Sequence, residues 1–178
     1  MLSDPLLIEK AKAIRLLICD VDGVLTTGVI YYLSQEMEMK GFHVHDGLGI
    51  KLLQKAGIPV AVISAKNSAV TAHRLQHLDI AHAYLGHENK LSAYEELKQK
   101  LRFNDNEIAF IGDDLPDLAL LRRVGLAITV PQAPAIIQQQ SHCITTKKAG
   151  KGAVREVCEF ILQAQAKYES VIESYLTT

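Results

Sequence analysis

The sequence predicts an α/β fold in which helices sandwich one Rossmann-like parallel sheet. Short apolar runs typical of buried strands alternate regularly with helical stretches along most of the chain. Such alternation is typical of a parallel sheet whose two faces are covered by helices. The 178 residues contain no internal repeat and no low-complexity linker, so residues 1–178 are expected to form a single domain.

The N-terminal part of the chain contains the one interruption of this alternation. Residues 1–12 are expected to form a short lead-in helix, and residues 14–19 the first buried strand. Over residues 28–43, β-forming residues on both sides of a polar turn predict a small β-hairpin that projects from the sheet. Helical spacing then resumes over residues 47–55.

From there the strands and helices follow one another closely. Strands are predicted at 59–63, 83–85, 108–111, 126–130 and, at a sheet edge, 143–145, and helices at 68–78, 91–101, 115–122 and 133–139. Apolar residues at helical spacing predict a long C-terminal helix and tail over residues 153–176. The far end of this helix extends beyond what one small sheet can cover. It is therefore expected either to pack on a partner subunit or to fray.

Composition and charge restrict the classes of function. A hydrophobic content of 48% and a charged content of 22% are typical of a folded globular protein. The net charge of −1 gives no basic excess for nucleic acid or an anionic membrane, and no segment approaches the length of a membrane span. The three cysteines are scattered, and one of them, Cys19, lies in a predicted core strand. We therefore expect reduced thiols and a cytoplasmic location.

Two aspartates stand directly after the first predicted strand. Asp20 and Asp22 belong to the string Asp20-Val21-Asp22-Gly23-Val24-Leu25-Thr26, which has the form DxDGxxT. Open α/β sheets bind their ligands at the carboxyl ends of the strands, which is where both carboxylates are expected. This placement is the most informative feature of the chain.

A second acidic cluster follows the strand at 108–111, and it contains Asp113, Asp114 and Asp117. Neighbouring parallel strands would bring it close to the first cluster. Mg²⁺ prefers oxygen ligands and few protein carboxylates, so the two clusters together predict a magnesium site. Taken alone, Asp113 or Asp114 would be better explained as the cap of the following helix, and only the pairing with the first cluster favours the metal site.

Two further side chains fit a phosphate-binding site. Ser64 ends the strand at 59–63, where its hydroxyl could hold a phosphate oxygen or could simply cap a helix. Lys90 stands at the start of the helix that follows the predicted strand at 83–85. A lysine at the start of a helix is unfavourable because its positive charge opposes the helix dipole. A nearby phosphate would explain this choice, although most single lysines are only solvated.

Taken in chain order, these motifs resemble those of the haloacid dehalogenase-like (HAD) hydrolases. The resemblance rests on DxDGxxT, then a hydroxyl at a strand end, then a lysine, then the GDDxxD form of residues 112–117. It implies that Asp20 is the nucleophile that becomes phosphorylated. It implies that Asp22 is the general acid and base, and that its backbone carbonyl ligates Mg²⁺ together with Asp20 and Asp113.

The same resemblance assigns supporting roles to the remaining motif residues. Ser64 and Lys90 would bind the phosphoryl group, Asp114 and Asp117 would support the metal site or Lys90, and Thr26 would steady the loop. Covalent catalysis by a carboxylate would divide one difficult displacement into two easier steps.

A closer resemblance is to the 3-deoxy-D-manno-octulosonate 8-phosphate (KDO-8-phosphate) phosphatases. It is carried by the small size and by the strings at residues 27–31, 42–50 and 152–158, and it spans nearly the whole chain. It implies a fold with no cap domain and a homotetramer in which the hairpin and C-terminal residues complete a neighbour's site. The implied reaction releases KDO and phosphate for lipopolysaccharide biosynthesis.

Some residues are expected to contact a sugar phosphate less directly. Lys66 stands where the family usually has arginine, after Ala65 in place of glycine, and lysine lacks the bidentate fork of arginine. His43, Asp46 and Arg155 are candidate substrate contacts near the motifs.

Three other functions remain open at this stage. A phosphatase for another sugar phosphate, such as a nonulosonate 9-phosphate, would share every motif. A receiver-like phospho-switch also joins an acidic cluster, a phosphorylatable Asp and a Lys, but Asp22 favours turnover of the phosphoenzyme. An inert scaffold conflicts with the presence of all the catalytic residue types.

Overall fold

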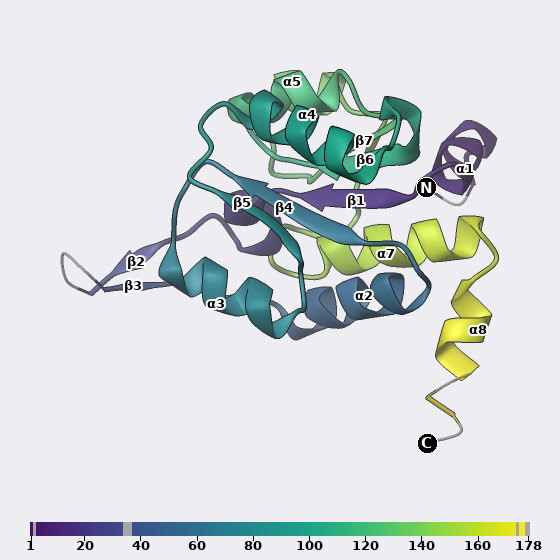
Figure 1. Ribbon diagram of the computed structural model, residues 1–178, viewed down its shortest axis with the longest axis horizontal. Coiled ribbons are helices and arrows are strands. Elements are labelled where there is room, and N and C mark those ends of the chain that lie inside the picture. Colours follow the sequence, from purple (N-terminus) through teal and green to yellow (C-terminus); the bar gives the residue numbers. More distant parts are fainter. Residues whose placement is uncertain (2, 34–36, 174, 177–178) are drawn as a thin grey trace.

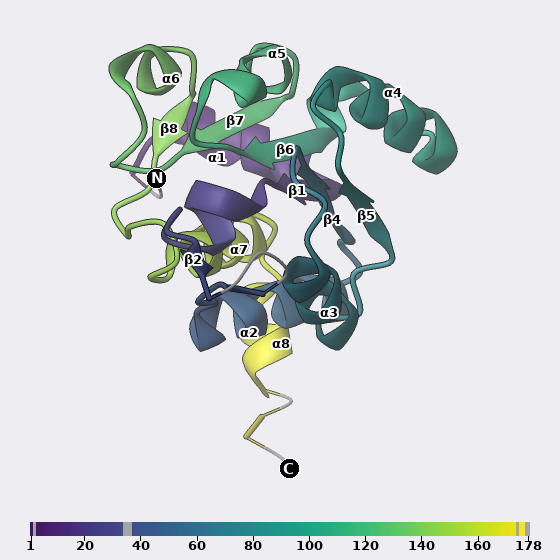
Figure 2. The same ribbon diagram turned by 90° about the vertical axis from the view of Figure 1, so that its left-hand side faces the viewer.

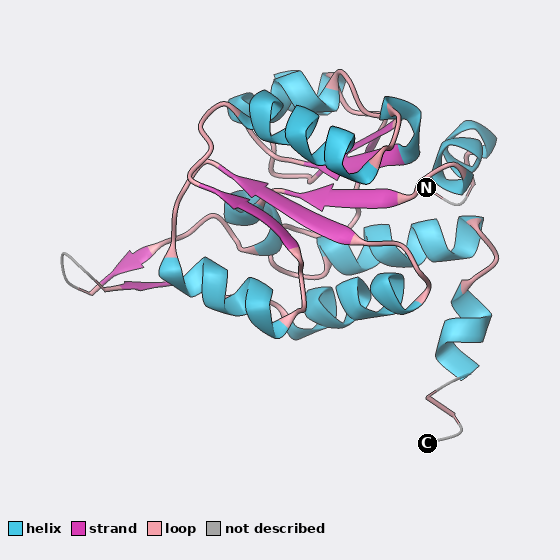
Figure 3. Cartoon of the chain, in the orientation of Figure 1, coloured by secondary structure: helices cyan, strands magenta, loops and turns pink. Residues whose placement is uncertain are grey.

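A parallel sheet forms the centre of the computed structural model, which describes residues 1, 3–33, 37–173 and 175–176 (Figure 3). In this described part of the chain the sheet has six strands in the order β5–β4–β1–β6–β7–β8, and every pair is parallel. The strands are β1 (Leu16–Cys19), β4 (Val60–Ser64), β5 (His82–Leu85), β6 (Ile108–Ile111), β7 (Leu126–Thr129) and β8 (Cys143–Ile144). The predicted Rossmann-like parallel sheet is confirmed.

The strand order places β1 between β4 and β6. In the register of the sheet, Ile18 lies opposite Ala61 on one side and Phe110 on the other. After β1 the chain builds β4 and β5 outward, then crosses back to build β6, β7 and β8 on the opposite side. The sheet therefore changes direction beside β1, and ligands bind at such a switch point in open α/β sheets.

Helices cover both faces of the sheet (Figures 1 and 2). One face carries α4 (Lys90–Leu101) and α5 (Leu118–Leu121), and the other carries α2 (Val44–Lys55), α3 (Ala69–His77) and α7 (Ala153–Ala164). The remaining helices are α1 (Pro5–Lys12), α6 (Ala135–Gln139) and α8 (Tyr168–Glu173). Because both faces are covered, β1, β6 and β7 are buried at every position, as expected for near-continuous apolar strands.

Helices α2 and α7 pack closely against each other. A Cβ added at Gly49 would lie only 2.9 Å from the Cα of Arg155, so the two backbones approach where no side chain intervenes. Ile50 and Leu53 of α2, like Val157 and Ile161 of α7, are fully buried. In this layer α2 packs on β4, and α7 contacts residues 21–25, the turn that follows β1.

The predicted hairpin is present, with shorter strands than residues 28–43 suggested. It pairs β2 (Tyr31–Tyr32) with β3 (Glu38–Met39) in antiparallel register, and residues 34–36 lie outside the described residues. The hairpin projects from one end of the molecule (Figure 1). Among the described residues between β1 and β4, the structure has only a short turn, this hairpin and α2, and these do not form a cap domain.

Two predicted helices are divided in the structure. The prediction of one continuous helix over residues 153–176 is wrong. Helix α7 ends at Ala164, and Ala166 has a left-handed φ of +53° before α8 begins. The Gln165 amide donates to the carbonyls of Ala11 and Ile14, which anchors the break. The helix predicted over 115–122 begins as a 3₁₀ turn, η3 (Leu115–Asp117), and continues as α5.

Among the described residues, no helix combines the length and apolar character needed to cross a bilayer.

We predict that Phe110→Ala lowers the free energy of unfolding by about 3–5 kcal/mol, because Phe110 is fully buried in β6 and its loss leaves a cavity. Chemical denaturation monitored by circular dichroism measures this. Leu6→Ala is the matched control, since Leu6 is 67% exposed on α1 and its truncation should change stability little. Equal effects of the two substitutions would contradict the assigned core.

Candidate active site

The loop after β1 holds the first two aspartates at the end of the sheet. The Asp20 N–H donates to the Ile111 carbonyl at 3.0 Å, which continues the β1–β6 pairing by one residue. The chain then forms an irregular turn, η1 (Val21–Leu25). The buried Thr26 hydroxyl accepts from the N–H groups of Gly23 and Gly28 at 3.4 and 3.1 Å and donates to Asp22 Oδ1 at 3.4 Å. These contacts join both ends of the loop to the Thr26 side chain.

Gly23 allows this loop to lie against the second acidic cluster. Its φ of +97° is left-handed, and a Cβ at this position would overlap the Asp113 carboxylate. Glycine therefore meets two requirements at once, since a side chain is disfavoured by the backbone and excluded by the neighbouring carboxylate. The backbone beside Asp22 consequently reaches close to Asp113.

Lys90 joins the two acidic clusters. Its Nζ lies 2.5 Å from Asp20 Oδ1 and 2.6 Å from Asp117 Oδ1, and all three side chains are buried. Burial opposes the charge of Lys90, but the two carboxylates outweigh it and raise the lysine pKa. Removing Lys90 would leave two buried carboxylates without their cation, which is strongly destabilising, whereas removing either aspartate would still leave Lys90 one carboxylate partner.

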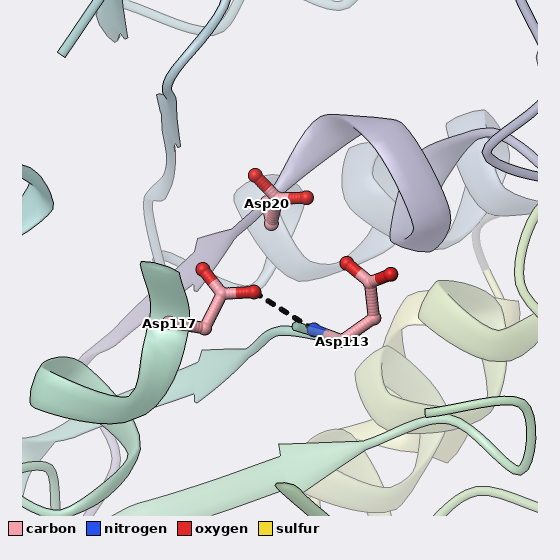
Figure 4. Close-up of side chains that lie close together, drawn as sticks. All are labelled: Asp20, Asp113 and Asp117. Carbon is pink, nitrogen blue, oxygen red and sulfur yellow. Dashed lines mark hydrogen bonds between the residues drawn. The ribbon is translucent and has the colours of Figure 1, made fainter. Parts of the chain in front are cut away.

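The two clusters nevertheless keep an excess of negative charge. Burial, followed by the charge of Asp117, raises the pKa of Asp20 to about 6 in spite of Lys90. Burial, followed by the charge of Asp20, raises the pKa of Asp113 to about 8. A cation bound among such crowded carboxylates would stabilise their ionised forms. Figure 4 shows the side chains of Asp20, Asp113 and Asp117 gathered where β1 and β6 end, with Asp117 coming from the helical turn that follows β6.

The donor set fits a magnesium ion. Carboxylate oxygens of Asp20, Asp113 and Asp117 lie within 4.8 Å of one another. Both Asp117 oxygens are already occupied, because Oδ1 accepts from Lys90 and Oδ2 accepts from the Asp113 N–H at 2.8 Å (Figure 4). Among the described residues, the Asp113 carboxylate has no hydrogen-bond donor. Asp113 and the second oxygen of Asp20 are therefore the side-chain oxygens available to a hard cation.

A cavity of about 240 Å³ opens onto these groups. Its lining comprises Asp20, Asp22, Ile30, Ser64, Ala65, Lys66, Lys90, Asp113, Asp114, Pro116 and Asp117. Ser64 is buried at the end of β4, and its oxygen accepts from the Lys66 N–H at 3.3 Å. Lys66 reaches the hairpin, where its Nζ donates to the Tyr32 hydroxyl at 2.8 Å. Asp114 Oδ1 accepts from the Leu115 N–H at 2.8 Å, so it caps η3 beside the cavity.

Lys40 is a site residue that the sequence did not reveal. Its side chain is fully buried, and its Nζ donates to Asp22 Oδ2 at 2.7 Å. It follows β3 at the base of the hairpin. No periodic or motif signal distinguishes Lys40 from a solvated lysine, because its burial depends on how the hairpin returns to α3 and the first loop.

Three predicted substrate contacts lie elsewhere. His43 and Arg155 line a separate cavity of about 450 Å³ between the loop before α2 and the start of α7, which shares no lining residue with the first cavity. Asp46 is buried and accepts from the N–H groups of Gly152 and Arg155 at 3.2 and 2.8 Å, so it caps α7 from α2. Arg155 is paired with Glu159 at 2.7 Å. The structure does not bring these three side chains to the Asp20 cluster.

Known proteins share this sequence and this fold. A family model described as haloacid dehalogenase-like hydrolase matches residues 66–157. The KDO-8-phosphate phosphatase of Yersinia pestis is 44% identical over 162 residues, which cover 91% of this chain and 87% of that protein. The chain belongs to the KDO-8-phosphate phosphatases, within the haloacid dehalogenase-like hydrolases.

Solved structures of KDO-8-phosphate phosphatases agree closely with this fold. The enzyme from Moraxella catarrhalis, in complex with a magnesium ion, a phosphate ion and a KDO molecule, has a TM-score of 0.92 and 43% identity, and the match covers 95% of this chain and 97% of that one. The cobalt-bound enzyme from Haemophilus influenzae has a TM-score of 0.90 and 37% identity, covering 94% and 99%. The family resemblance predicted from the motifs is confirmed.

We predict that Asp113→Asn raises the thermal midpoint of the metal-free protein, because it removes one of the mutually repelling buried carboxylates. The same substitution should largely abolish the stabilisation by Mg²⁺, which for a wild-type site at a hundredfold excess over Kd amounts to about 2.7 kcal/mol. Thermal denaturation with and without Mg²⁺ measures both effects. Asp79→Asn, which removes an exposed carboxylate that does not line the cavity, should keep the Mg²⁺ response. An undiminished response in Asp113→Asn would rule out Asp113 as a metal ligand.

Proposed function

We propose that the chain is a magnesium-dependent phosphatase that hydrolyses KDO-8-phosphate to KDO and inorganic phosphate through an aspartyl-phosphate. The observation that carries this proposal is that Asp20 and Asp22 line one cavity, each held by its own buried lysine, together with Asp113, whose carboxylate accepts no hydrogen bond from the described residues. Membership in the KDO-8-phosphate phosphatases supplies the substrate, and the lipopolysaccharide role follows from that substrate.

The first half of the reaction is assigned to Asp20 and Asp22. An Asp20 oxygen attacks phosphorus as the bond from phosphorus to the sugar oxygen breaks, and protonated Asp22 gives its proton to that oxygen. Lys90 favours the ionised, nucleophilic form of Asp20 and, with the Ser64 hydroxyl, stabilises charge on the transferring group. A bound Mg²⁺ would neutralise part of the phosphate charge that otherwise repels the nucleophile.

The second half regenerates the enzyme. Asp22, now ionised, takes a proton from water as the water oxygen attacks the phosphorus of the aspartyl-phosphate, and the Asp20 carboxylate leaves. This base function distinguishes the proposed enzyme from a phospho-switch, in which the phosphoryl group persists. Asp22 is suited to it because its side chain is 21% exposed and lines the cavity that water enters.

The size of the cavity bears on how a sugar phosphate would bind. About 240 Å³ is below the range of pockets that enclose a whole small molecule, so the phosphoryl group fits inside and the sugar extends to the mouth. Ile30 and Lys66 line the cavity, and Tyr32 of the hairpin holds Lys66 from outside. We assign Lys66 to contact with the anionic substrate, where it offers a single charge without the fork of arginine.

We expect phosphate release from KDO-8-phosphate at a higher kcat/KM than from a nonulosonate 9-phosphate or a hexose phosphate, and no release once Mg²⁺ is chelated. Restoring Mg²⁺ should restore the rate. Asp20→Asn, which keeps the shape of the side chain but removes the nucleophile, should abolish turnover and serves as the control for contaminating phosphatases. A clearly higher kcat/KM for the nonulosonate 9-phosphate would show that this compound, and not KDO-8-phosphate, is the substrate. The proposed phosphatase mechanism would still hold. Activity retained by Asp20→Asn would remove Asp20 as the nucleophile.

We further propose that the protein is a homotetramer in which the hairpin docks on another copy near its active site. The hairpin exposes apolar side chains: Val29, Tyr31, Tyr32, Leu33, Met37 and Met39 are each about half exposed or more. Contiguous exposed apolar residues on a projecting element favour burial against a partner. A neighbour's hairpin would also close the open mouth of the cavity, which no cap domain covers.

Leu33→Glu tests this assembly, because a charge on the 65% exposed Leu33 should prevent apolar docking. We expect a smaller species by analytical ultracentrifugation and a lower kcat/KM. Leu6→Glu is the matched control, since Leu6 is equally exposed but lies on α1, away from the hairpin. A variant that keeps both the assembly and the activity of the wild type would argue against the hairpin interface.

We place the reaction in the cytoplasm. Cys19, Cys143 and Cys158 are all free, and Cys19 and Cys158 are buried without forming a disulfide. Such thiols are typical of a reducing compartment. The proposed substrate is a small sugar phosphate, so neither nucleic acid nor membrane lipid is assigned as a partner.

A further inference from the structure

Lys40 has no part in the proposed chemistry, yet it is buried in the site. Its side chain has no exposed area, and its Nζ lies 2.7 Å from Asp22 Oδ2 and 3.4 Å from the Thr71 hydroxyl of α3. Burying an ammonium group costs several kcal/mol unless it is paired. Asp22 provides the only carboxylate that pairs with Lys40 among the described residues.

The two aspartates of the first motif are thus held in parallel ways. Lys90 binds Asp20 at 2.5 Å, and Lys40 binds Asp22 at 2.7 Å. Lys90 also binds Asp117, whereas the second neighbour of Lys40 is only a hydroxyl, that of Thr71. The contact of Lys40 is therefore directed mainly at one side chain.

Both oxygens of the Asp22 carboxylate are fixed from different directions. Oδ2 accepts from Lys40 at the base of the hairpin, and Oδ1 accepts from Thr26 in the same loop as Asp22. Rotation of the carboxylate would break both contacts. Lys40 gives the shorter of the two, at 2.7 Å against 3.4 Å, and it is charge-assisted. Lys40 is consequently the main determinant of where the carboxylate points.

We propose that Lys40 is a positioning residue that holds Asp22 in the orientation from which it protonates the leaving oxygen. This inference rests on the proposed phosphatase function. Proton transfer requires a correctly placed acid, and its contribution to rate depends on that placement. Lys40 follows β3 directly, and Glu38 of β3 contacts the Ser68 hydroxyl at the start of α3. The hairpin is thus held on α3 by a contact of its own, separate from the contact between Lys40 and Asp22.

The dependence of rate on the leaving group tests this inference. A sugar alkoxide is a poor leaving group that needs a proton, whereas p-nitrophenolate leaves without one. We expect Lys40→Met to lower kcat/KM for KDO-8-phosphate by about 10²-fold, the scale of general acid catalysis, and to lower kcat/KM for p-nitrophenyl phosphate far less. A merely structural defect would lower both values by the same factor.

Glu38→Gln is the matched control. It weakens the contact of the same hairpin with Ser68 while leaving the Lys40–Asp22 contact in place, so any effect on the two substrates should be equal. Circular dichroism and thermal denaturation verify that each variant is folded. Should Lys40→Met fail to fold, Lys40→Gln carries the same test, because its neutral, shorter side chain keeps hydrogen-bonding capacity in the buried site.

The outcomes separate this inference from the function on which it rests. A folded Lys40 variant that loses both activities equally, or loses neither, overturns the positioning role alone. A wild-type protein that releases phosphate from neither substrate overturns the proposed function, and the positioning role with it. Selective loss on the sugar phosphate, with equal effects in Glu38→Gln, supports the assignment.

Discussion

The ion pair that Lys90 makes with Asp20 and Asp117 is the interaction on which the rest of the site depends. It joins three segments that are far apart in the sequence, because Asp20 follows β1, Lys90 begins α4 and Asp117 ends η3. One buried ammonium shared by two buried carboxylates offsets part of their charge and leaves the site with a net negative charge. The strand order makes this possible by placing β1 and β6 next to each other at the point where the sheet changes direction.

Lys90 and the Asp113 N–H each donate to one oxygen of the Asp117 carboxylate, so the carboxylates of Asp20 and Asp113 are left for other interactions. In the described part of the chain, Lys90 binds one oxygen of Asp20 and leaves the other for chemistry, and the Asp113 carboxylate accepts no hydrogen bond and is available to a cation. The elevated pKa values of Asp20 and Asp113 have a common cause, which is burial of neighbouring acids without enough positive charge. The same imbalance that destabilises the metal-free protein therefore favours binding of a hard divalent ion.

The hairpin takes the place that a cap domain would fill. It lies beside the cavity, contributes Tyr32 as a partner for Lys66, and ends in Lys40, which reaches back to Asp22. An element of this size cannot enclose a sugar by itself, and its exposed apolar side chains favour a partner molecule. The proposed assembly and the proposed catalysis therefore both depend on one short insertion between β1 and α2.

The sequence by itself determined the sheet, its flanking helices and the catalytic residue types, because apolar periodicity and the spacing of Asp20, Asp22 and Asp113 are local properties of the chain. It could not determine the break after α7, which depends on Gln165 binding carbonyls of residues far away in the chain. Nor could it separate Asp46 from the sugar-binding candidates, since its capping of α7 requires α2 and α7 to be packed together. Lys40 is the clearest case: its charge is visible in the sequence, but only the folded hairpin buries it against Asp22. Tertiary structure decided these functions because each arises from contacts between residues that are distant in the sequence.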